Sequence, residues 1–154
     1  MQEQFAREEN VTGRKAKQCG FVVHPKCPWL RYFADGIVFG ANGPELLLEI
    51  KCLCKGKTKI INDYLNFCSF LEKDYTLKKK HSYYGQIQLG LLILNIWSCY
   101  FVLYLFFDKF MYILKIPYNE NYAIDMLTNV RYVYMSKMLH YFCKENKENR
   151  TLNN

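Results

Sequence analysis

Several marks of well-known protein classes are missing from this sequence. It has no internal repeat and no low-complexity tract, and its seven cysteines follow no regular spacing. We therefore expect neither a disulfide framework nor a zinc site, and we favour a reducing compartment. Residues 1–10 are polar and charged, so we expect no secretory signal there. The sequence contains no recognisable glycine-rich phosphate loop and no recognisable Ser/His/Asp set for nucleophilic catalysis. These absences predict an intracellular protein, without distinguishing nucleus from cytoplasm.

The composition that is present predicts a folded domain. Of the 154 residues, 51% are hydrophobic and 17% are aromatic, which excludes intrinsic disorder. The length fits one domain with a modest core. The 21 lysines and arginines outnumber the 14 acidic residues and give a formal net charge of +7. This balance makes a polyanion a better candidate partner than a basic substrate, although charge alone does not identify the partner.

The longest stretch without a charged residue covers residues 82–107. It is long enough to cross a bilayer as a helix, so a small membrane protein is one alternative. However, the stretch contains several amide side chains, and its pattern changes midway from helical spacing to a run of aromatic and aliphatic residues. We favour a buried helix over 82–95 followed by a buried strand over 97–104, with no membrane span.

Turn residues divide the rest of the chain into short elements. The predicted strands cover residues 20–23, 35–39, 45–52, 97–104 and 110–117. The predicted helices cover the first dozen residues, residues 82–95 and residues 119–142. Turn residues at 40–44 join two of the strands into a hairpin. This order predicts a mixed α/β fold, with one domain over residues 1–143 and a polar tail over residues 144–154.

The strand predicted over 45–52 carries two charged residues within an apolar run. Side chains two positions apart on a strand share a face, so Glu49 and Lys51 point the same way. If the hairpin is regular and centred on Asn42, Asp35 lies opposite Glu49, because both are equally far from that centre. Two carboxylates and one ammonium group would then converge at one point of a buried sheet.

Such a group has a clear chemical use. Two neighbouring carboxylates repel each other unless a cation lies between them, and oxygen ligands suit Mg²⁺, which also binds phosphate oxygens. A metal held there would activate a water for in-line attack on a phosphodiester. Lys51 would neutralise charge at phosphorus or orient that water. The same spacing also fits a structural salt bridge, and the residues alone leave both interpretations open.

Five blocks of residues along the chain, two of which contain the charged group just described, carry a further signal. In order, they are Cys19-Gly20-Phe21-Val22-Val23-His24-Pro25, Pro28-Trp29-Leu30, Asp35-Gly36-Ile37-Val38, Leu47-Leu48-Glu49-Ile50-Lys51-Cys52 and Tyr83-Tyr84-Gly85-Gln86-Ile87-Gln88. Together they resemble the YqaJ-type viral recombinases, the lambda-exonuclease-like branch of the PD-(D/E)XK nuclease superfamily. The resemblance spans nearly the whole chain. It implies a restriction-endonuclease-like core, in which helices flank a mixed central β-sheet.

The resemblance also implies an activity, a cofactor and partners. The implied activity is metal-dependent hydrolysis of DNA, as a 5′-to-3′ exonuclease acting from the end of a duplex, with two Mg²⁺ or Mn²⁺ ions. The residues given a role are Asp35, Glu49 and the carbonyl of Ile50 as metal ligands, Lys51 as the catalytic lysine, and a glutamine of the pair Gln86 and Gln88 as a site-lining residue. Of this pair, we favour a functional role for Gln88. A ring-shaped homo-oligomer and a single-strand annealing protein are the implied partners.

Two departures from the family pattern leave an alternative open. Where the family reads Ser-Pro-Asp-Gly, this chain has Phe33-Ala34-Asp35-Gly36, without the proline and the hydroxyl. The family's N-terminal helix carries a glutamate in a Glu-x-x-Ala context, which Glu3 matches, but the spacing from Glu3 to Gly13 is short. Glu3 is therefore an open candidate for a helix acid. The alternative function is a catalytically impaired copy that binds DNA without cutting it.

Basic residues flank the predicted site on both sides. The candidates for contacts with DNA are Lys55, Lys57, Lys59, Lys78, Lys79, Lys80 and Tyr84. The lysines would bind the phosphate backbone and add affinity and salt dependence without sequence preference. Tyr84 either stacks on a frayed base or packs in the core.

Overall fold

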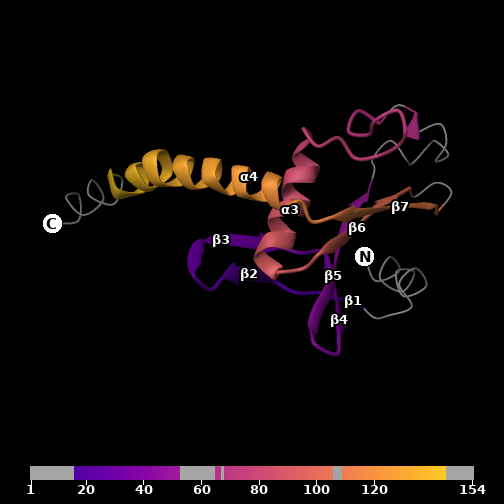
Figure 1. Ribbon diagram of the computed structural model, residues 1–154, viewed down its shortest axis with the longest axis horizontal. Helices are drawn as coiled ribbons and strands as arrows, with labels where there is room; N and C mark the ends of the chain where they lie inside the picture. The colour runs from indigo at the N-terminus through magenta and orange to yellow at the C-terminus, as the bar shows by residue number, and fades with distance from the viewer. Residues whose placement is uncertain (1–15, 53–64, 67, 106–108, 145–154) are drawn as a thin grey trace. The chain divides into compact units, whose positions relative to one another are not determined.

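A hairpin that contains a bulge sets the geometry at the centre of the fold. The computed structural model describes residues 16–52, 65, 66, 68–105 and 109–144 (Figure 1). Within it, β4 (Gly36–Gly40) and β5 (Gly43–Cys52) pair antiparallel. Gly40 pairs with Gly43, and the register then shifts after Phe39 so that Gly36 pairs with Leu48. Continuing this register by one residue places Asp35 opposite Glu49, as the sequence predicts.

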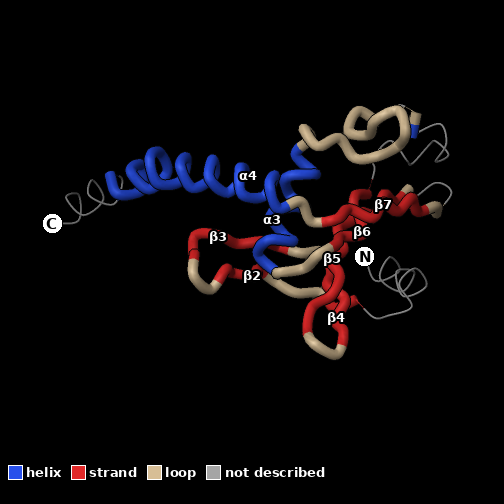
Figure 2. Tube along the Cα trace, in the orientation of Figure 1, coloured by secondary structure: helices blue, strands red, loops and turns tan. Residues whose placement is uncertain are grey.

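The hairpin belongs to a five-stranded mixed sheet, shown in red in Figure 2. Its other strands are β1 (Ala16–Lys17), β6 (Ser98–Tyr104) and β7 (Met111–Pro117). Among the residues that the structure describes, the strand order is β1-β4-β5-β6-β7, and only the β5–β6 pair is parallel. A parallel pair needs a long crossover, and the chain between β5 and β6 contains the helix α3 (Ser82–Leu94).

The predicted change from helix to strand in the uncharged stretch is confirmed. Helix α3 begins after His81, whose imidazole accepts a hydrogen bond from the backbone N–H of Tyr83. It ends at Asn95, which adopts the left-handed conformation with φ of 54°, as asparagine tolerates better than most residues. Strand β6 follows within a few residues. In the described part of the chain, no helix is long and apolar enough to cross a membrane.

The core lies where α3 packs against β5 and β6. Ile87 and Leu91 lie one helical turn apart on α3, and each is at most 1% exposed. Leu47 on β5 and Phe101 on β6 are also completely buried. Each such side chain contributes about 1.5–3 kcal/mol of hydrophobic stabilisation. This packing anchors the charged residues of β5 beside the first turns of α3.

A second, two-stranded sheet is partly missed by the sequence interpretation. It pairs β2 (Phe21–His24) with β3 (Cys27–Phe33), and α3 packs against both strands. Strand β2 matches a predicted strand. Strand β3 was not predicted, because prolines at 25 and 28 argue for a turn. Pro28 falls within the register shift between the pairs Val23–Arg31 and His24–Cys27, and such a bulge does not require every N–H.

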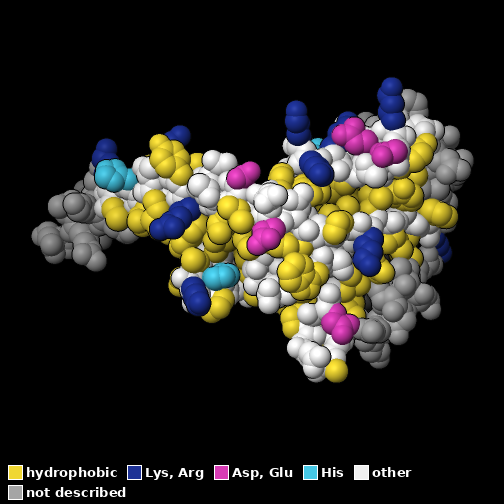
Figure 3. Space-filling model, in the orientation of Figure 1, with side chains coloured by type: hydrophobic (Ala, Val, Ile, Leu, Met, Phe, Trp, Pro, Cys, Tyr) yellow, Lys and Arg dark blue, Asp and Glu magenta, His cyan; other side chains and the backbone are white. Residues whose placement is uncertain are grey.

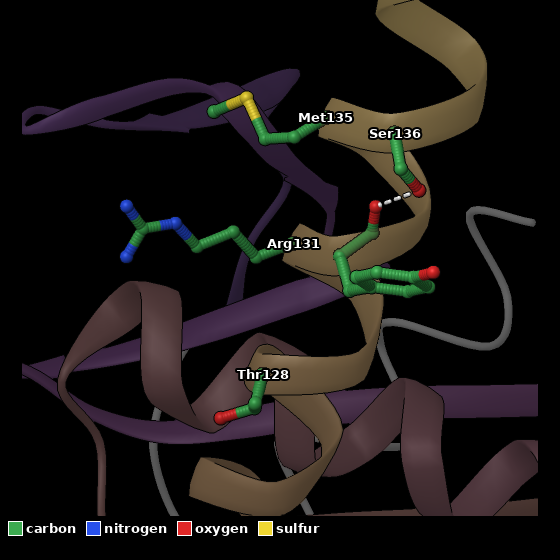
Figure 4. Close-up of a pocket in the computed structure, with 5 residues that line it drawn as sticks. Thr128, Arg131, Met135 and Ser136 are labelled. Atoms are coloured by element: carbon green, nitrogen blue, oxygen red, sulfur yellow. Dashed lines mark hydrogen bonds between the residues drawn. The ribbon is translucent and has the colours of Figure 1, made fainter.

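The chain divides into two compact units, residues 1–118 and residues 119–154. The second unit contains α4 (Glu120–Val133), which continues through a π-helical segment, η2 (Tyr134–Met138), to residue 144. The predicted C-terminal helix is thus confirmed. A pocket of about 530 Å³ on this helix is lined by Thr128, Arg131, Tyr132, Met135 and Ser136 (Figure 4). None of the predicted site residues belongs to this unit.

Candidate active site

Glu49 is a buried acid with three hydrogen-bond donors around its carboxylate. Its side chain is 1% exposed, in the C-terminal half of β5. The Tyr32 hydroxyl on β3 donates to Oε2 at 2.6 Å. The Lys51 ammonium donates to Oε1 at 2.5 Å, and the Gln86 side-chain amide on α3 donates to the same oxygen. Residues from two sheets and a helix therefore meet at one carboxylate.

The surroundings of Glu49 shift the pKa of its carboxyl in opposite directions. Burial is the main effect and raises the pKa of the Glu49 carboxyl, because the charged form loses its hydration. Hydrogen bonds from Lys51 and Tyr32 lower that pKa, whereas the nearby negative charge of Asp35 raises it. The net direction is upward. A cation that approached both acids would remove the repulsion between them.

Asp35 is fixed beside Glu49 by a backbone hydrogen bond. Its Oδ2 accepts from the backbone N–H of Ile50, with 2.8 Å between the nitrogen and the oxygen. The bond holds the short connection between β3 and β4 against β5. The connection follows Phe33 and contains Ala34, which is 1% exposed. The departure from the family's Ser-Pro pattern thus leaves the acid next to Glu49.

Lys51 lies between Glu49 and an aromatic cluster. Its side chain is 20% exposed, and its ammonium group lies 5.2 Å from the centre of the Tyr83 ring. This distance is within the range of a cation–π interaction. The Tyr83 ring in turn packs against Phe70, His81 and Phe101. Lys51 is therefore held by an acid and a ring, with part of its side chain open to solvent.

The two glutamines of α3 have different surroundings. Gln86 donates to Glu49, so it belongs to the site. Gln88 is completely buried, and its amide donates to the backbone carbonyl of Pro117 on β7 at 2.9 Å. This contact connects α3 to the edge of the five-stranded sheet. Of the pair that the sequence assigns to the site, the structure brings Gln86 to Glu49 and holds Gln88 at β7.

The oxygen donors present fit a divalent cation such as Mg²⁺ or Mn²⁺. Asp35 and Glu49 are neighbours across the hairpin, and Ile50 lies next to Glu49 along β5. Hard cations prefer carboxylate and carbonyl oxygens. The described residues contain no group of three or more His, Cys, Asp or Glu side chains arranged for a metal. Glu3, the candidate helix acid, lies outside the described residues.

The candidate DNA contacts are only partly within the described residues. Lys55, Lys57 and Lys59 lie outside them. Lys79 and Lys80 are exposed just before α3, whereas the Lys78 ammonium donates to the carbonyl of Ser69 at 2.7 Å. Acidic residues accompany these lysines, as the dark blue and magenta side chains over the loop before α3 show in Figure 3. Tyr84 is 6% exposed, which fits core packing better than base stacking.

Sequence reasoning missed two side chains of the site. Tyr32 was not recognised, because a tyrosine in an aromatic-rich segment is typical of an ordinary core residue. Tyr83 was given no role beyond its place in a block of the family resemblance, although its ring faces Lys51. A signal for Tyr32 was present in Gly90, since an isolated glycine inside a helical pattern often has a packing reason. An alanine side chain at Gly90 would overlap the Tyr32 ring.

Two solved structures resemble this one over almost its whole length. Both are of an alkaline exonuclease, LHK-Exo, from Laribacter hongkongensis, one of them in complex with dAMP. Each covers 98% of this chain with a TM-score of 0.71, and this chain covers 71% of theirs. The chain has the fold of these exonucleases. The predicted α/β, restriction-endonuclease-like core is thereby confirmed.

Sequence identity to these structures is low, at 20% and 21%. The likeness therefore establishes the fold and not the activity. No family model and no curated protein matches the sequence. Membership of the YqaJ-type family stays a prediction.

Proposed function

We propose that this protein is a metal-dependent deoxyribonuclease that degrades duplex DNA from an end. The observation that carries the proposal is the group around Glu49, in which Asp35, Lys51 and Gln86 surround one buried carboxylate. A fold shared with alkaline exonucleases supports it. The resemblance of the sequence to viral recombinases favours the 5′-to-3′ direction.

Asp35, Glu49 and the backbone carbonyl of Ile50 are the proposed ligands of one or two Mg²⁺ or Mn²⁺ ions. When bound, such ions supply a water of lowered pKa and stabilise negative charge on the phosphate. The hydrogen bond from Ile50 N–H leaves Asp35 anchored through Oδ2. The protein thus holds its two acids in place before a metal arrives, which is the arrangement that rapid chemistry requires.

Lys51 is the proposed residue that stabilises charge during phosphodiester cleavage. Its ammonium group is held by Glu49 and by the Tyr83 ring, so its position is fixed before substrate binds. A cation positioned in advance stabilises a developing charge without further rearrangement. Gln86 would keep the Glu49 carboxylate oriented on the side that faces α3.

We propose duplex DNA as the substrate because the net charge is +7 and because Lys79 and Lys80 are exposed. Contacts to phosphates would position the duplex without reading its sequence. The ring-shaped oligomer and the single-strand annealing partner follow only from the resemblance to viral recombinases and stay predictions.

A second candidate is a relative that binds DNA without cutting it. The observation that favours it is that the Glu49 carboxylate already accepts three hydrogen bonds, two of them, from Lys51 and Gln86, at Oε1. A metal at Oε1 must then compete with Lys51 and Gln86 for this oxygen. The loss of the Ser-Pro pair before Asp35 points the same way.

Release of nucleotides from end-labelled duplex DNA separates the two candidates. Duplexes labelled at the 5′ or the 3′ end are incubated with Mg²⁺, Mn²⁺ or EDTA, and binding to the same duplexes is measured at several salt concentrations. Metal-dependent release, earlier from the 5′ label, supports the exonuclease. Salt-sensitive binding without release supports the second candidate. A protein that neither releases nucleotides nor binds the duplex contradicts both candidates.

A further inference from the structure

We infer that Tyr32 is a positioning residue for the Glu49 carboxylate and that Gly90 is the residue that lets it take this place. The role presupposes the proposed metal-dependent nuclease function, and it adds a series of contacts from α3 through β3 to the acid on β5. Neither residue belongs to the sequence blocks that carry the resemblance to viral recombinases.

Tyr32 is the buried member of the three donors around Glu49. Its side chain is 4% exposed, and its hydroxyl lies 2.6 Å from Oε2. Lys51 and Gln86 share the other oxygen, and both are only part-buried. An aromatic ring has few rotatable bonds, so its hydroxyl defines the direction of the carboxylate more sharply than a long flexible side chain does.

Gly90 explains how the ring of Tyr32 reaches this position. A Cβ atom built at Gly90 would lie 2.5 Å from Cζ of Tyr32 and 2.7 Å from Cε1. It would also lie 2.9 Å from Cδ2 of Leu47. Cζ carries the hydroxyl, so any side chain at position 90 would displace the very atom that holds the donor to Glu49. Glycine inside a helix lowers stability, and here it makes room for the tyrosine ring.

The consequence for the site concerns metal affinity. Loss of a residue that hydrogen-bonds to a metal ligand and orients it typically costs about 10- to 100-fold in metal affinity or activity. Removal of the Tyr32 hydroxyl leaves Oε2 of Glu49 buried without this donor, and the part-buried Lys51 and Gln86 on Oε1 are left to orient the carboxylate. A carboxylate held through both oxygens binds metal more tightly than one held less firmly.

Calorimetric titration with Mn²⁺ tests this role on the full chain without relying on catalysis. The proteins compared are wild type, Tyr32→Phe, Gly90→Ala and the double variant. Tyr104→Phe is the matched control, because it removes a hydroxyl from another buried tyrosine, the last residue of β6, which pairs with Cys52 and not with Glu49. Thermal unfolding shows that each variant is folded, and DNA binding in EDTA is measured alongside.

Tyr32→Phe and Gly90→Ala are each expected to raise the Kd for Mn²⁺ by about 10-fold or more. The double variant should bind no more weakly than Tyr32→Phe, because displacement of a ring without a hydroxyl removes no further donor. Tyr104→Phe should bind Mn²⁺ like wild type, and all variants should bind DNA equally in EDTA. If Gly90→Ala does not fold, Tyr32→Phe alone decides the result.

Two results overturn the role of Tyr32 alone. One is a Tyr32→Phe protein of lowered melting temperature and unchanged Mn²⁺ affinity, which would make the hydroxyl merely structural. The other is an equal loss of affinity in Tyr104→Phe. Absence of Mn²⁺ binding by the wild-type protein overturns the proposed metal-dependent function itself, and the positioning role with it.

Discussion

The carboxylate of Asp35 accepts a hydrogen bond from the backbone N–H of Ile50, at 2.8 Å. Asp35 therefore has two separable properties, a hydrogen-bond acceptor for the fold and a negative charge for the site. Asp35→Asn keeps an acceptor oxygen and removes the charge. Asp35→Ala removes both and leaves a part-buried N–H without this partner.

Asp35→Asn is expected to unfold at the same urea concentration as wild type. Its rate of metal-dependent cleavage is expected to fall by at least about 100-fold. Asp35→Ala should lose the same activity and, in addition, about 1–3 kcal/mol in the free energy of unfolding. Urea unfolding and nucleotide release measure the two effects separately. Equal destabilisation by both substitutions would show that the Ile50 bond contributes nothing to the fold.

Gln86 and Gln88 are expected to give opposite phenotypes although both lie in the first turns of α3. Gln86→Leu removes a donor to Glu49 and should reduce cleavage about 10-fold or more with little change in stability. Gln88→Leu leaves the Pro117 carbonyl without its bond and should cost about 1–3 kcal/mol of stability. Its cleavage per folded molecule should match wild type. A loss of cleavage in the folded Gln88→Leu protein would show that Gln88 does contribute to the active site.

Lys79 and Lys80 should act through the phosphate backbone. Both are exposed, whereas the Lys78 ammonium is bonded to the carbonyl of Ser69. Removing one lysine that binds a phosphate reduces the slope of log affinity against log salt by about one. The Lys79→Ala, Lys80→Ala double variant should therefore lose a slope of about two, and Lys78→Ala less than one. Slopes from DNA titrations at four salt concentrations test this, and an unchanged slope in the double variant would exclude these lysines from the interface.

Glu49 should make the metal-free protein less stable as the pH rises. Burial raises the pKa of Glu49 above its ordinary value of 4.5. Above pH 4.5 the unfolded chain releases this proton before the folded one does, so the folded state binds more protons and stability falls until the pH passes the folded pKa. The amide introduced by Glu49→Gln does not titrate, so this variant lacks the effect.

The difference in unfolding free energy between Glu49→Gln and wild type should thus be constant below pH 4.5 and grow in favour of the variant above it. Urea unfolding in EDTA between pH 4 and pH 8 measures this difference. A pH-independent difference would mean that Glu49 has the same pKa in the folded and unfolded chain.

The elements that could be predicted from the sequence are those with strong local patterns. Helix α3 and strand β6 follow from a change of periodicity within one uncharged stretch. The pairing of Asp35 with Glu49 was predicted from a regular turn centred on Asn42. The structure reaches the same pairing by a different route, because Gly40 pairs with Gly43 and a bulge then shifts the register. Without that shift, Asp35 would face Leu48.

The contacts that could not be predicted are those made across the fold. Strand β3 was missed because of Pro28, which a strand tolerates here because it lies in the register shift of the β2–β3 pair. The hydrogen bond between Tyr32 and Glu49 joins two different sheets, and no spacing along the chain predicts such a contact. The roles of Gln86 and Gln88 differ because α3 turns one towards β5 and the other towards β7.

Cleavage by a Lys51→Ala variant tests the central claim that the group around Glu49 is the catalytic site. Lys115→Ala is the matched control, since it removes an exposed lysine from β7 of the same sheet. Release of nucleotides from duplex DNA in Mg²⁺ is measured for both variants and for wild type, together with DNA binding. Wild type and Lys115→Ala are expected to cleave at the same rate, and Lys51→Ala about 100- to 1,000-fold more slowly with unchanged binding. Undiminished cleavage by Lys51→Ala would place the chemistry elsewhere and contradict the account.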